Sequence, residues 1–142
     1  MQIVTVMSRT EAIRYCYKTH SLSSIMISIS DPSEMNAKAP FKTTQNGIKS
    51  ILRLYFEDKE RGDGTMTRED AVSIRNFVEA FPDAQQIIVH CGAGISRSAG
   101  VAAAILKRFT GSDERIFQNP RYCPNMHVYR MLLNEFYESE SN

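Results

Sequence analysis

A short glycine-containing segment in the second half of the sequence carries a cysteine near one end and an arginine near the other. The segment spans residues 90–98 and reads HCGAGISRS. Gly92 and Gly94 allow the backbone to curl with its N–H groups pointing inward, which makes a concave site suited to phosphate oxygens. Arg97 can bind two such oxygens at once through its planar guanidinium. A thiolate at Cys91, stabilised by these donors, would be a nucleophile placed beneath a bound phosphate.

Two apolar stretches flank this segment and predict the elements that hold it. Residues 86–90 (QIIVH) indicate a short buried strand, and residues 98–109 (SAGVAAAILKRF), apolar nearly all round, indicate a helix packed against a sheet. Ligands in open α/β sheets bind outside the carboxyl ends of the strands. A helix that begins there presents unpaired amides and the positive end of its dipole. The sequence therefore predicts an anion site in the loop between strand and helix.

The rest of the chain alternates between strand and helix patterns. Strands are expected at residues 2–7, 24–30 and 50–56, and helices at residues 8–18, 67–81 and 113–117, with a last helix that starts near an N-cap at Asn125 and frays from residue 138. Residues 33–47 are predicted to form a loop, and the charged residues 57–66 an exposed, mobile one. This order predicts an α/β fold, with residues 1–142 as a single domain and a mainly parallel central sheet flanked by helices.

The segment also matches a known signature. His90, Cys91, Gly94, Arg97 and Ser98 fit H-C-x-x-G-x-x-R-[ST], and on this match the chain resembles the protein tyrosine phosphatase superfamily, most of all its small dual-specificity-type members in microbial form. The resemblance implies a cysteine-phosphatase-like fold and one phosphatase domain over residues 1–142. It implies an enzyme that removes phosphate from phosphotyrosine in proteins, with phosphoserine and phosphothreonine as further substrates.

A two-step mechanism with assigned roles comes with this resemblance. Cys91 attacks phosphorus to form a phosphocysteine intermediate, and water then releases phosphate. Ser98 donates to the Cys91 sulfur and helps it leave, while His90 orients the loop from behind. The residues expected to bind the phosphate are Gly92, Ala93, Gly94, Ile95, Ser96 and Arg97.

The general acid of that family is an aspartate on a mobile loop some thirty-odd residues before the cysteine, after a strand. This spacing favours Asp58, which follows the strand predicted at residues 50–56. Asp63 is the first alternative, and Glu57 and Glu60 are the others. The sequence FEDK at residues 56–59 departs from the W-P-D form of the larger tyrosine phosphatases.

The other two cysteines, Cys16 and Cys123, form neither a disulfide framework nor a metal-ligand cluster with Cys91, because no two cysteines are closely spaced. We interpret both as small buried hydrophobic residues rather than redox partners of Cys91. This usage favours a reducing compartment, so the expected location is cytoplasmic. No metal and no cofactor are expected.

Charge excludes some functions. Lys and Arg total 17 and Asp and Glu total 16, so no basic field marks a nucleic-acid or membrane partner. The expected partners are a phosphorylated protein or peptide, and phosphate or vanadate anions in the site. One alternative is a phosphoinositide or inositol-polyphosphate phosphatase, but such loops usually carry lysines and residues 92–96 carry no charge. Another is a catalytically silent phosphate-binding module, although the nucleophile and the arginine are both present.

Overall fold

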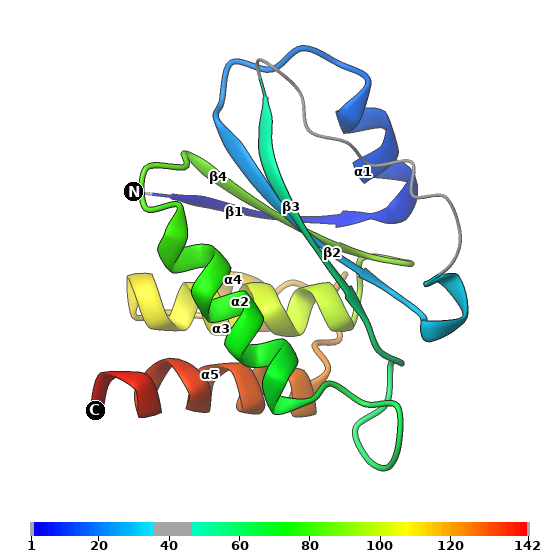
Figure 1. The fold of residues 1–142 in the computed structure, drawn as a ribbon, viewed down its shortest axis with the longest axis vertical. Coiled ribbons are helices and arrows are strands. Elements are labelled where there is room, and N and C mark those ends of the chain that lie inside the picture. Colours follow the sequence, from blue (N-terminus) through cyan, green and yellow to red (C-terminus); the bar gives the residue numbers. More distant parts are fainter. Residues whose placement is uncertain (1, 36–46, 142) are drawn as a thin grey trace.

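The central sheet is built from four parallel strands in the part of the chain that the computed structural model describes, residues 2–35 and 47–141. Their order across the sheet is β1-β4-β2-β3 (Figure 1). Because every neighbouring pair is parallel, the carboxyl ends of the strands meet along one edge. The strands are β1 (Ile3–Ser8), β2 (Ser24–Ser30), β3 (Ile48–Tyr55) and β4 (Gln86–Cys91).

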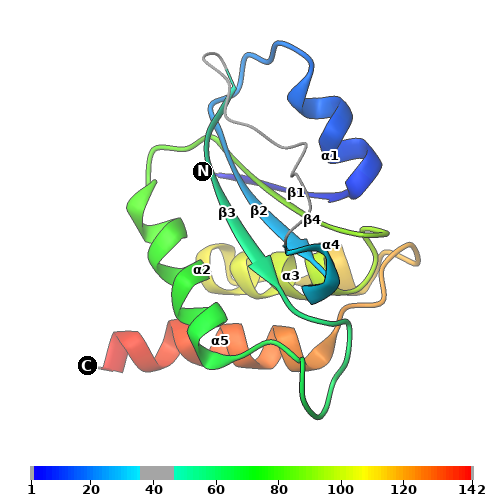
Figure 2. The ribbon, with the colours of Figure 1, turned by 45° about the vertical axis from the view of Figure 1, so that its right-hand side comes forward.

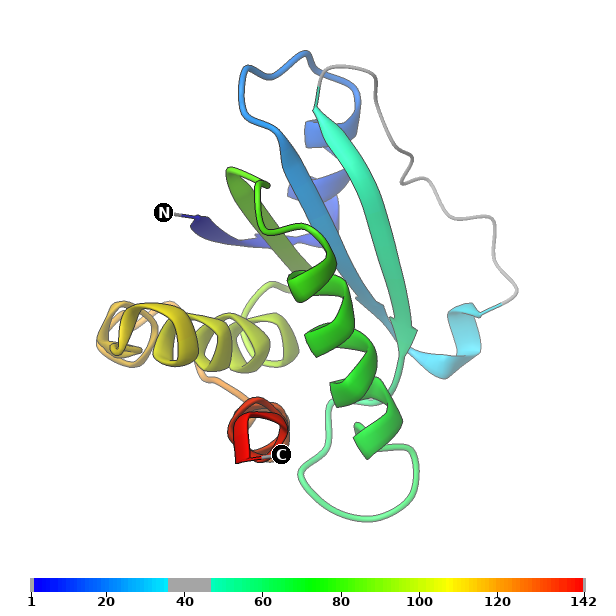
Figure 3. The same cartoon turned by 60° about the vertical axis from the view of Figure 1, so that its left-hand side comes forward.

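Helices cover both faces of this sheet. α1 (Arg9–Cys16) lies on one face; α2 (Arg68–Ala80), α3 (Arg97–Thr110) and α5 (Met126–Ser141) lie on the other, with α3 next to the sheet and α5 beyond it (Figures 1 and 3). Two short elements, η1 (Pro32–Glu34) and α4 (Glu114–Phe117), lie in connections. No helix in residues 2–35 and 47–141 combines the length and the apolar character needed to cross a membrane.

The core is divided by the sheet into two parts. Along β4, Ile87 and Val89 belong to the larger cluster under α3, whereas Ile88 packs with Ala12 and Cys16 of α1. Successive side chains of a strand point to opposite faces, so one strand supplies both clusters. Both faces are buried, as is usual for a parallel sheet.

Local signals in the sequence explain where the helices begin. At the start of α1 the Ser8 side chain accepts from the Glu11 amide, and the Glu11 carboxylate accepts from the Ser8 amide. Thr67 and Asp70 make the same reciprocal pair at the start of α2. Each capping box satisfies amide groups that have no partner within the helix.

The predicted elements agree with the structure within about two residues, and the sheet is wholly parallel. The expected fraying from residue 138 is wrong, because α5 continues to Ser141. Its last turns are held by α3, where Arg108 pairs with Glu140 and Phe109 packs edge-on against Phe136. Of the loop predicted at residues 33–47, residues 36–46 lie outside the described part of the chain.

A close contact between α3 and α5 brings the start of α5 next to the first turn of α3. A Cβ atom built on Gly100 would lie 2.8 Å from the backbone oxygen of Asn125 and 3.2 Å from the Cβ of Val128. The first of these distances is too short for a carbon and an oxygen atom that are not bonded. Only glycine therefore fits here without a shift of backbone.

Replacing Gly100 with alanine tests this contact. We expect Gly100→Ala to lower the free energy of unfolding by about 1–3 kcal/mol through overpacking, although alanine is favoured over glycine in a helix interior by about 1 kcal/mol. Urea unfolding at an unchanged m-value measures the difference. A variant at least as stable as the parent would show that the helices are not this close.

Candidate active site

The cysteine of the signature segment is the last residue of β4, and the arginine is the first of α3. Between them lies the signature loop, residues 92–96, at the carboxyl edge of the sheet (Figure 2). Cys91 is 3% exposed, and its Sγ lies 3.0 Å from Ser98 Oγ and 3.5 Å from the Ser98 amide nitrogen. Both the hydroxyl and the amide of Ser98 can donate to this sulfur.

The signature loop rests on the end of β1 and requires a glycine there. Gly94 has φ +70°, and a Cβ atom built on it would lie 2.7 Å from the Ser8 nitrogen and 2.8 Å from the Met7 oxygen. The Arg9 amide donates to the Gly92 oxygen at 3.0 Å. Both the backbone conformation and the lack of room for a side chain therefore explain why the signature specifies glycine at position 94.

Arg97 connects the ends of three strands. Its side chain is nearly buried, and its Nη1 donates to Asp31 Oδ1 at 2.8 Å and to the Phe56 backbone oxygen at 2.8 Å. Asp31 follows β2 and Phe56 follows β3, while Arg97 itself comes after β4. Nη2 faces the signature loop, since a Cβ atom built on Gly92 would lie 3.8 Å from it. These bonds orient the guanidinium before any ligand arrives.

Asp31 was not among the residues singled out from the sequence. Its position directly after a strand at the carboxyl edge is the one signal that could have marked it. The structure shows it as the carboxylate that pairs with Arg97.

His90 is fully buried behind the loop, as its predicted supporting role requires. Its Nε2 lies 2.7 Å from the hydroxyl of Ser28, the residue paired with it on β2. Its Nδ1 lies 3.5 Å from the backbone oxygen of Cys91, which can only accept a hydrogen bond. Burial, the largest cause, acts with the nearby positive charges of Arg9 and Arg97, and against the raising effect of the Cys91 contact, to lower the pKa of His90 to about 4. The ring is therefore neutral at physiological pH.

Of the four carboxylates considered for the general acid, Asp58 contacts the signature loop. Its Oδ1 accepts from Ser96 Oγ at 2.7 Å and from Asn125 Nδ2 at 2.9 Å. Glu57 pairs instead with Lys59, and Glu60 accepts from the amide of Met126. Within the described residues Asp63 makes no hydrogen bond to this loop.

Asn125 links several parts of the site. Its Oδ1 accepts from the Val128 amide at 3.1 Å, so the predicted N-cap of α5 is confirmed. Its amide nitrogen donates to the Ser96 oxygen at 3.0 Å, and its Nδ2 donates to Asp58 and to the Lys59 oxygen. The sequence marks Asn125 only as a cap, because nothing local reveals partners so distant along the chain.

The remaining cysteines differ from each other. Cys16 is buried in the cluster under α1, as expected. Cys123 is exposed, so its predicted burial is wrong. It lies in the irregular connection before α5, where its amide donates to the Ile95 oxygen and no helix face or strand covers it.

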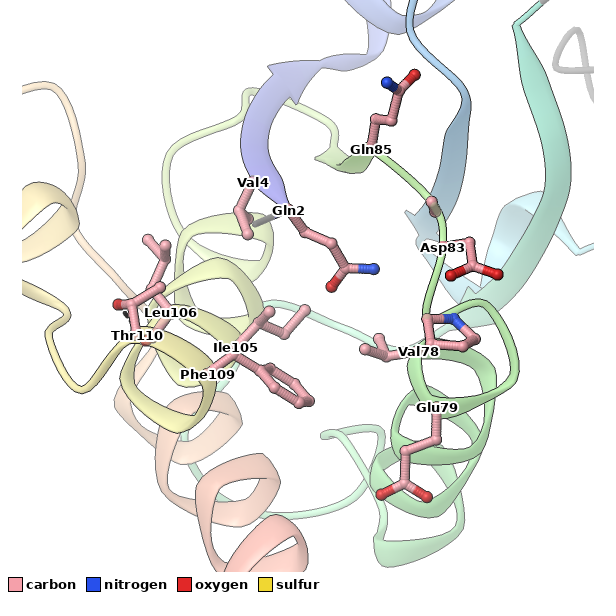
Figure 4. A pocket seen from close by; sticks show the side chains of 12 residues that line it. Gln2, Val4, Val78, Glu79, Asp83, Gln85, Ile105, Leu106, Phe109 and Thr110 are labelled. Carbon is pink, nitrogen blue, oxygen red and sulfur yellow. Dashed lines mark hydrogen bonds between the residues drawn. The ribbon is translucent and has the colours of Figure 1, made fainter.

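A cavity of about 650 Å³ lies at the opposite end of the sheet from the signature loop. It is bounded by the amino ends of β1 and β4 and by the last turns of α2 and α3. Figure 4 shows Val4, Ile105 and Phe109 facing Val78 across it. None of the residues 90–98 lines this cavity. The chemistry of the side chains, rather than the size of a hollow, thus locates the candidate active site.

Comparison with known proteins supports the class of fold. No protein-family model matches the sequence, and no curated protein matches it. A solved structure of human tyrosine phosphatase-like serine/threonine/tyrosine-interacting protein is similar at 19% identity and a TM-score of 0.67, over 97% of this chain and 92% of that one. Human DUSP28 is similar at 20% identity and a TM-score of 0.65, over 97% and 93% of the two chains. PTPMT1, solved in complex with PI(5)P, is similar at 19% identity and a TM-score of 0.61, over 98% and 93%.

The chain therefore has the fold of dual-specificity-type cysteine phosphatases, as the sequence predicted. Within that class of fold, it carries the HCGAGISRS segment at the carboxyl end of the central strand β4.

The buried histidine predicts a pH dependence of stability. Because the folded pKa of about 4 lies below the ordinary 6.5, the folded protein binds this proton less readily than the unfolded chain. The stability from neutral His90 is fully present above pH 6.5 and is lost as the pH falls toward 4, by up to about 3 kcal/mol. Urea unfolding across this window should show the parent losing more stability than His90→Gln, which has no titrating ring. Parallel curves for the two proteins would contradict the assignment.

Proposed function

We propose that the chain is a cysteine-dependent phosphomonoester hydrolase that removes phosphate from phosphotyrosine in proteins, with phosphoserine and phosphothreonine as further substrates. The observation that carries the proposal is the contact of the Cys91 sulfur with Ser98 beneath a loop closed by an oriented Arg97. The Cys91 sulfur, which two groups of Ser98 contact at the start of α3, is the proposed nucleophile, and the loop amides of residues 92–96 supply the donors for phosphate oxygens.

The first proposed step transfers the phosphoryl group to sulfur. The Cys91 thiolate forms a bond to phosphorus while the bond from phosphorus to the leaving oxygen breaks. Asp58, protonated, gives its proton to that oxygen, so the leaving group departs as a neutral alcohol or phenol. Loop amides and Arg97 stabilise the charge on the equatorial oxygens, which is the largest contribution expected in phosphoryl transfer.

The second proposed step returns the enzyme to its starting form. Water attacks phosphorus, the Asp58 carboxylate takes the proton of the water, and the bond from phosphorus to sulfur breaks. The Ser98 hydroxyl, 3.0 Å from the sulfur, donates to the thiolate as it leaves. Inorganic phosphate is released and Asp58 is protonated again, so protons and charges balance over the cycle.

A phosphoinositide or inositol polyphosphate is the second candidate substrate, because one similar structure, that of PTPMT1, was solved with PI(5)P. Additional phosphates would meet residues 92–96 of the signature loop, which carry no charge. The cation at this site is Arg97, which follows the loop. This favours a substrate with one phosphate. Phosphate release from a phosphotyrosine peptide and from an inositol phosphate, at equal concentration, separates the two.

Loss of the nucleophile is the first test of the proposal. The parent should hydrolyse para-nitrophenyl phosphate in the presence of a chelator and be inhibited by vanadate, and Cys91→Ser should reduce kcat on the order of 10³-fold or more. Cys123→Ser is the matched control, because that exposed side chain has no proposed role, and it should keep the parental rate. Turnover that survives Cys91→Ser would refute both the mechanism and the class of enzyme.

Loss of the proposed acid should change the kinetics in a different way. Asp58→Asn should reduce kcat/KM by roughly 10²–10⁴-fold on phenyl phosphate, whose leaving group needs a proton, and far less on a phosphate ester with an acidic leaving group. The basic limb of the pH profile should vanish, since no proton remains to be lost from this position. Asp63→Asn should retain the parental profile. If the two variants behave in the reverse way, the acid is Asp63.

A further inference from the structure

The serine that precedes Arg97 occupies the N-cap position of α3 but does not cap the helix. A serine at this position normally accepts a hydrogen bond from the amide two or three residues on. The Ser96 hydroxyl makes no such bond. It donates instead to Asp58 Oδ1 at 2.7 Å, 38 positions away in the sequence. The amide of Ser98, which a cap would engage, lies 3.5 Å from the Cys91 sulfur. The Ser96 hydroxyl thus bonds the 57–66 loop and not the amides of α3.

A second donor reaches the same carboxylate oxygen from the residue that precedes α5. Asn125 is 3% exposed, and its Nδ2 lies 2.9 Å from Asp58 Oδ1. Its backbone amide donates to the Ser96 oxygen and its Oδ1 accepts from the Val128 amide, so the side-chain amide cannot turn over without losing the cap. Two elements that are remote in the sequence therefore converge on one oxygen of an exposed aspartate.

Two donors on one oxygen decide where a proton can sit. A carboxylate oxygen that accepts from an O–H and an N–H has both lone pairs engaged. Protonation of Oδ1 would break one of these bonds, whereas protonation of Oδ2 keeps both. The proton of the acid therefore resides on Oδ2.

We infer that Ser96 and Asn125 are positioning residues that make Asp58 Oδ2 the proton-bearing oxygen and hold it over the signature loop. This inference rests on the proposed function of Asp58 as the acid. In the first step Oδ2 gives its proton to the leaving oxygen, and in the second Oδ2 takes a proton from the attacking water. Through both steps Oδ1 keeps its two donors, so the carboxyl group need not rotate between them.

Three variants separate this role from a merely structural one. Ser96→Ala removes one donor. Ser96→Thr keeps a hydroxyl and serves as the matched control. Asn125→Ser removes the Nδ2 donor while keeping an oxygen that can cap α5, because serine and asparagine are comparable N-caps. Thermal unfolding of each variant checks that the fold is retained.

The readout is kcat/KM across pH on two substrates, phenyl phosphate and 2,4-dinitrophenyl phosphate. Ser96→Ala and Asn125→Ser should each lose about tenfold or more on phenyl phosphate and little on the dinitrophenyl ester, whose leaving group needs no proton. Ser96→Thr, which keeps the hydroxyl, should lose less than Ser96→Ala on phenyl phosphate. Equal losses on both substrates would overturn the inference.

A double-variant cycle distinguishes failure of the inference from failure of the proposed function. If Ser96 acts through Asp58, adding Ser96→Ala to Asp58→Asn should lower kcat/KM on phenyl phosphate little beyond the loss that Asp58→Asn causes alone. If Ser96→Ala lowers kcat/KM by the same factor in the parent and in Asp58→Asn, Ser96 does not act through Asp58 and the positioning role is wrong. If Asp58→Asn itself leaves the pH profile and the phenyl phosphate rate unchanged, it is the assignment of Asp58 as the acid that fails. The pair Ser96→Ala and Ser96→Thr decides the matter even where Asn125→Ser does not fold.

Discussion

A buried sulfur at the end of a central strand, in contact with the first turn of the following helix, is the interaction on which this structure depends. Burying a polar or charged atom is costly unless donors surround it. Here the Cys91 sulfur meets both the hydroxyl and the amide of Ser98. Those groups are available only because α3 starts immediately after the loop and because its N-cap residue does not use them.

The parallel sheet supplies the rest of the site at a single edge. Its order places β4 between β1 and β2, so the loop after Cys91 touches the end of β1 on one side, and Arg97 after the loop bonds Asp31 at the end of β2 on the other. Arg97 extends this contact to Phe56 after β3. A guanidinium that is nearly buried would be unfavourable without these acceptors. The same bonds that satisfy it also orient it toward the loop.

Contacts of Asn125, at the start of α5, hold the 57–66 loop near this edge of the sheet. Gly100 allows α5 to approach α3 so closely that Asn125 reaches the Ser96 backbone, Asp58 and Lys59 together. The 57–66 loop is irregular and largely exposed, as its charged sequence predicted. Its place relative to the signature loop nevertheless depends on a buried asparagine in the last third of the chain. A packing contact between two helices thereby controls the position of a carboxylate proposed as the acid.

What the sequence alone determined is local. The elements follow from periodicity and caps, and the chemistry of residues 90–98 follows from glycine, cysteine and arginine held close together by the chain itself. The partners of that segment were decided by the tertiary structure, since Ser28 bonds His90, Asp31 bonds Arg97 and Asn125 bonds Asp58 across 62, 66 and 67 positions. These pairings depend on strand order and register. β2 and β4 are buried along their whole length. The alternation in β2 (SIMISIS) separates its two faces and β4 (QIIVHC) has none, but neither sequence shows which strand lies beside it. Packing of complete elements supplies that information, and no short stretch of sequence contains it.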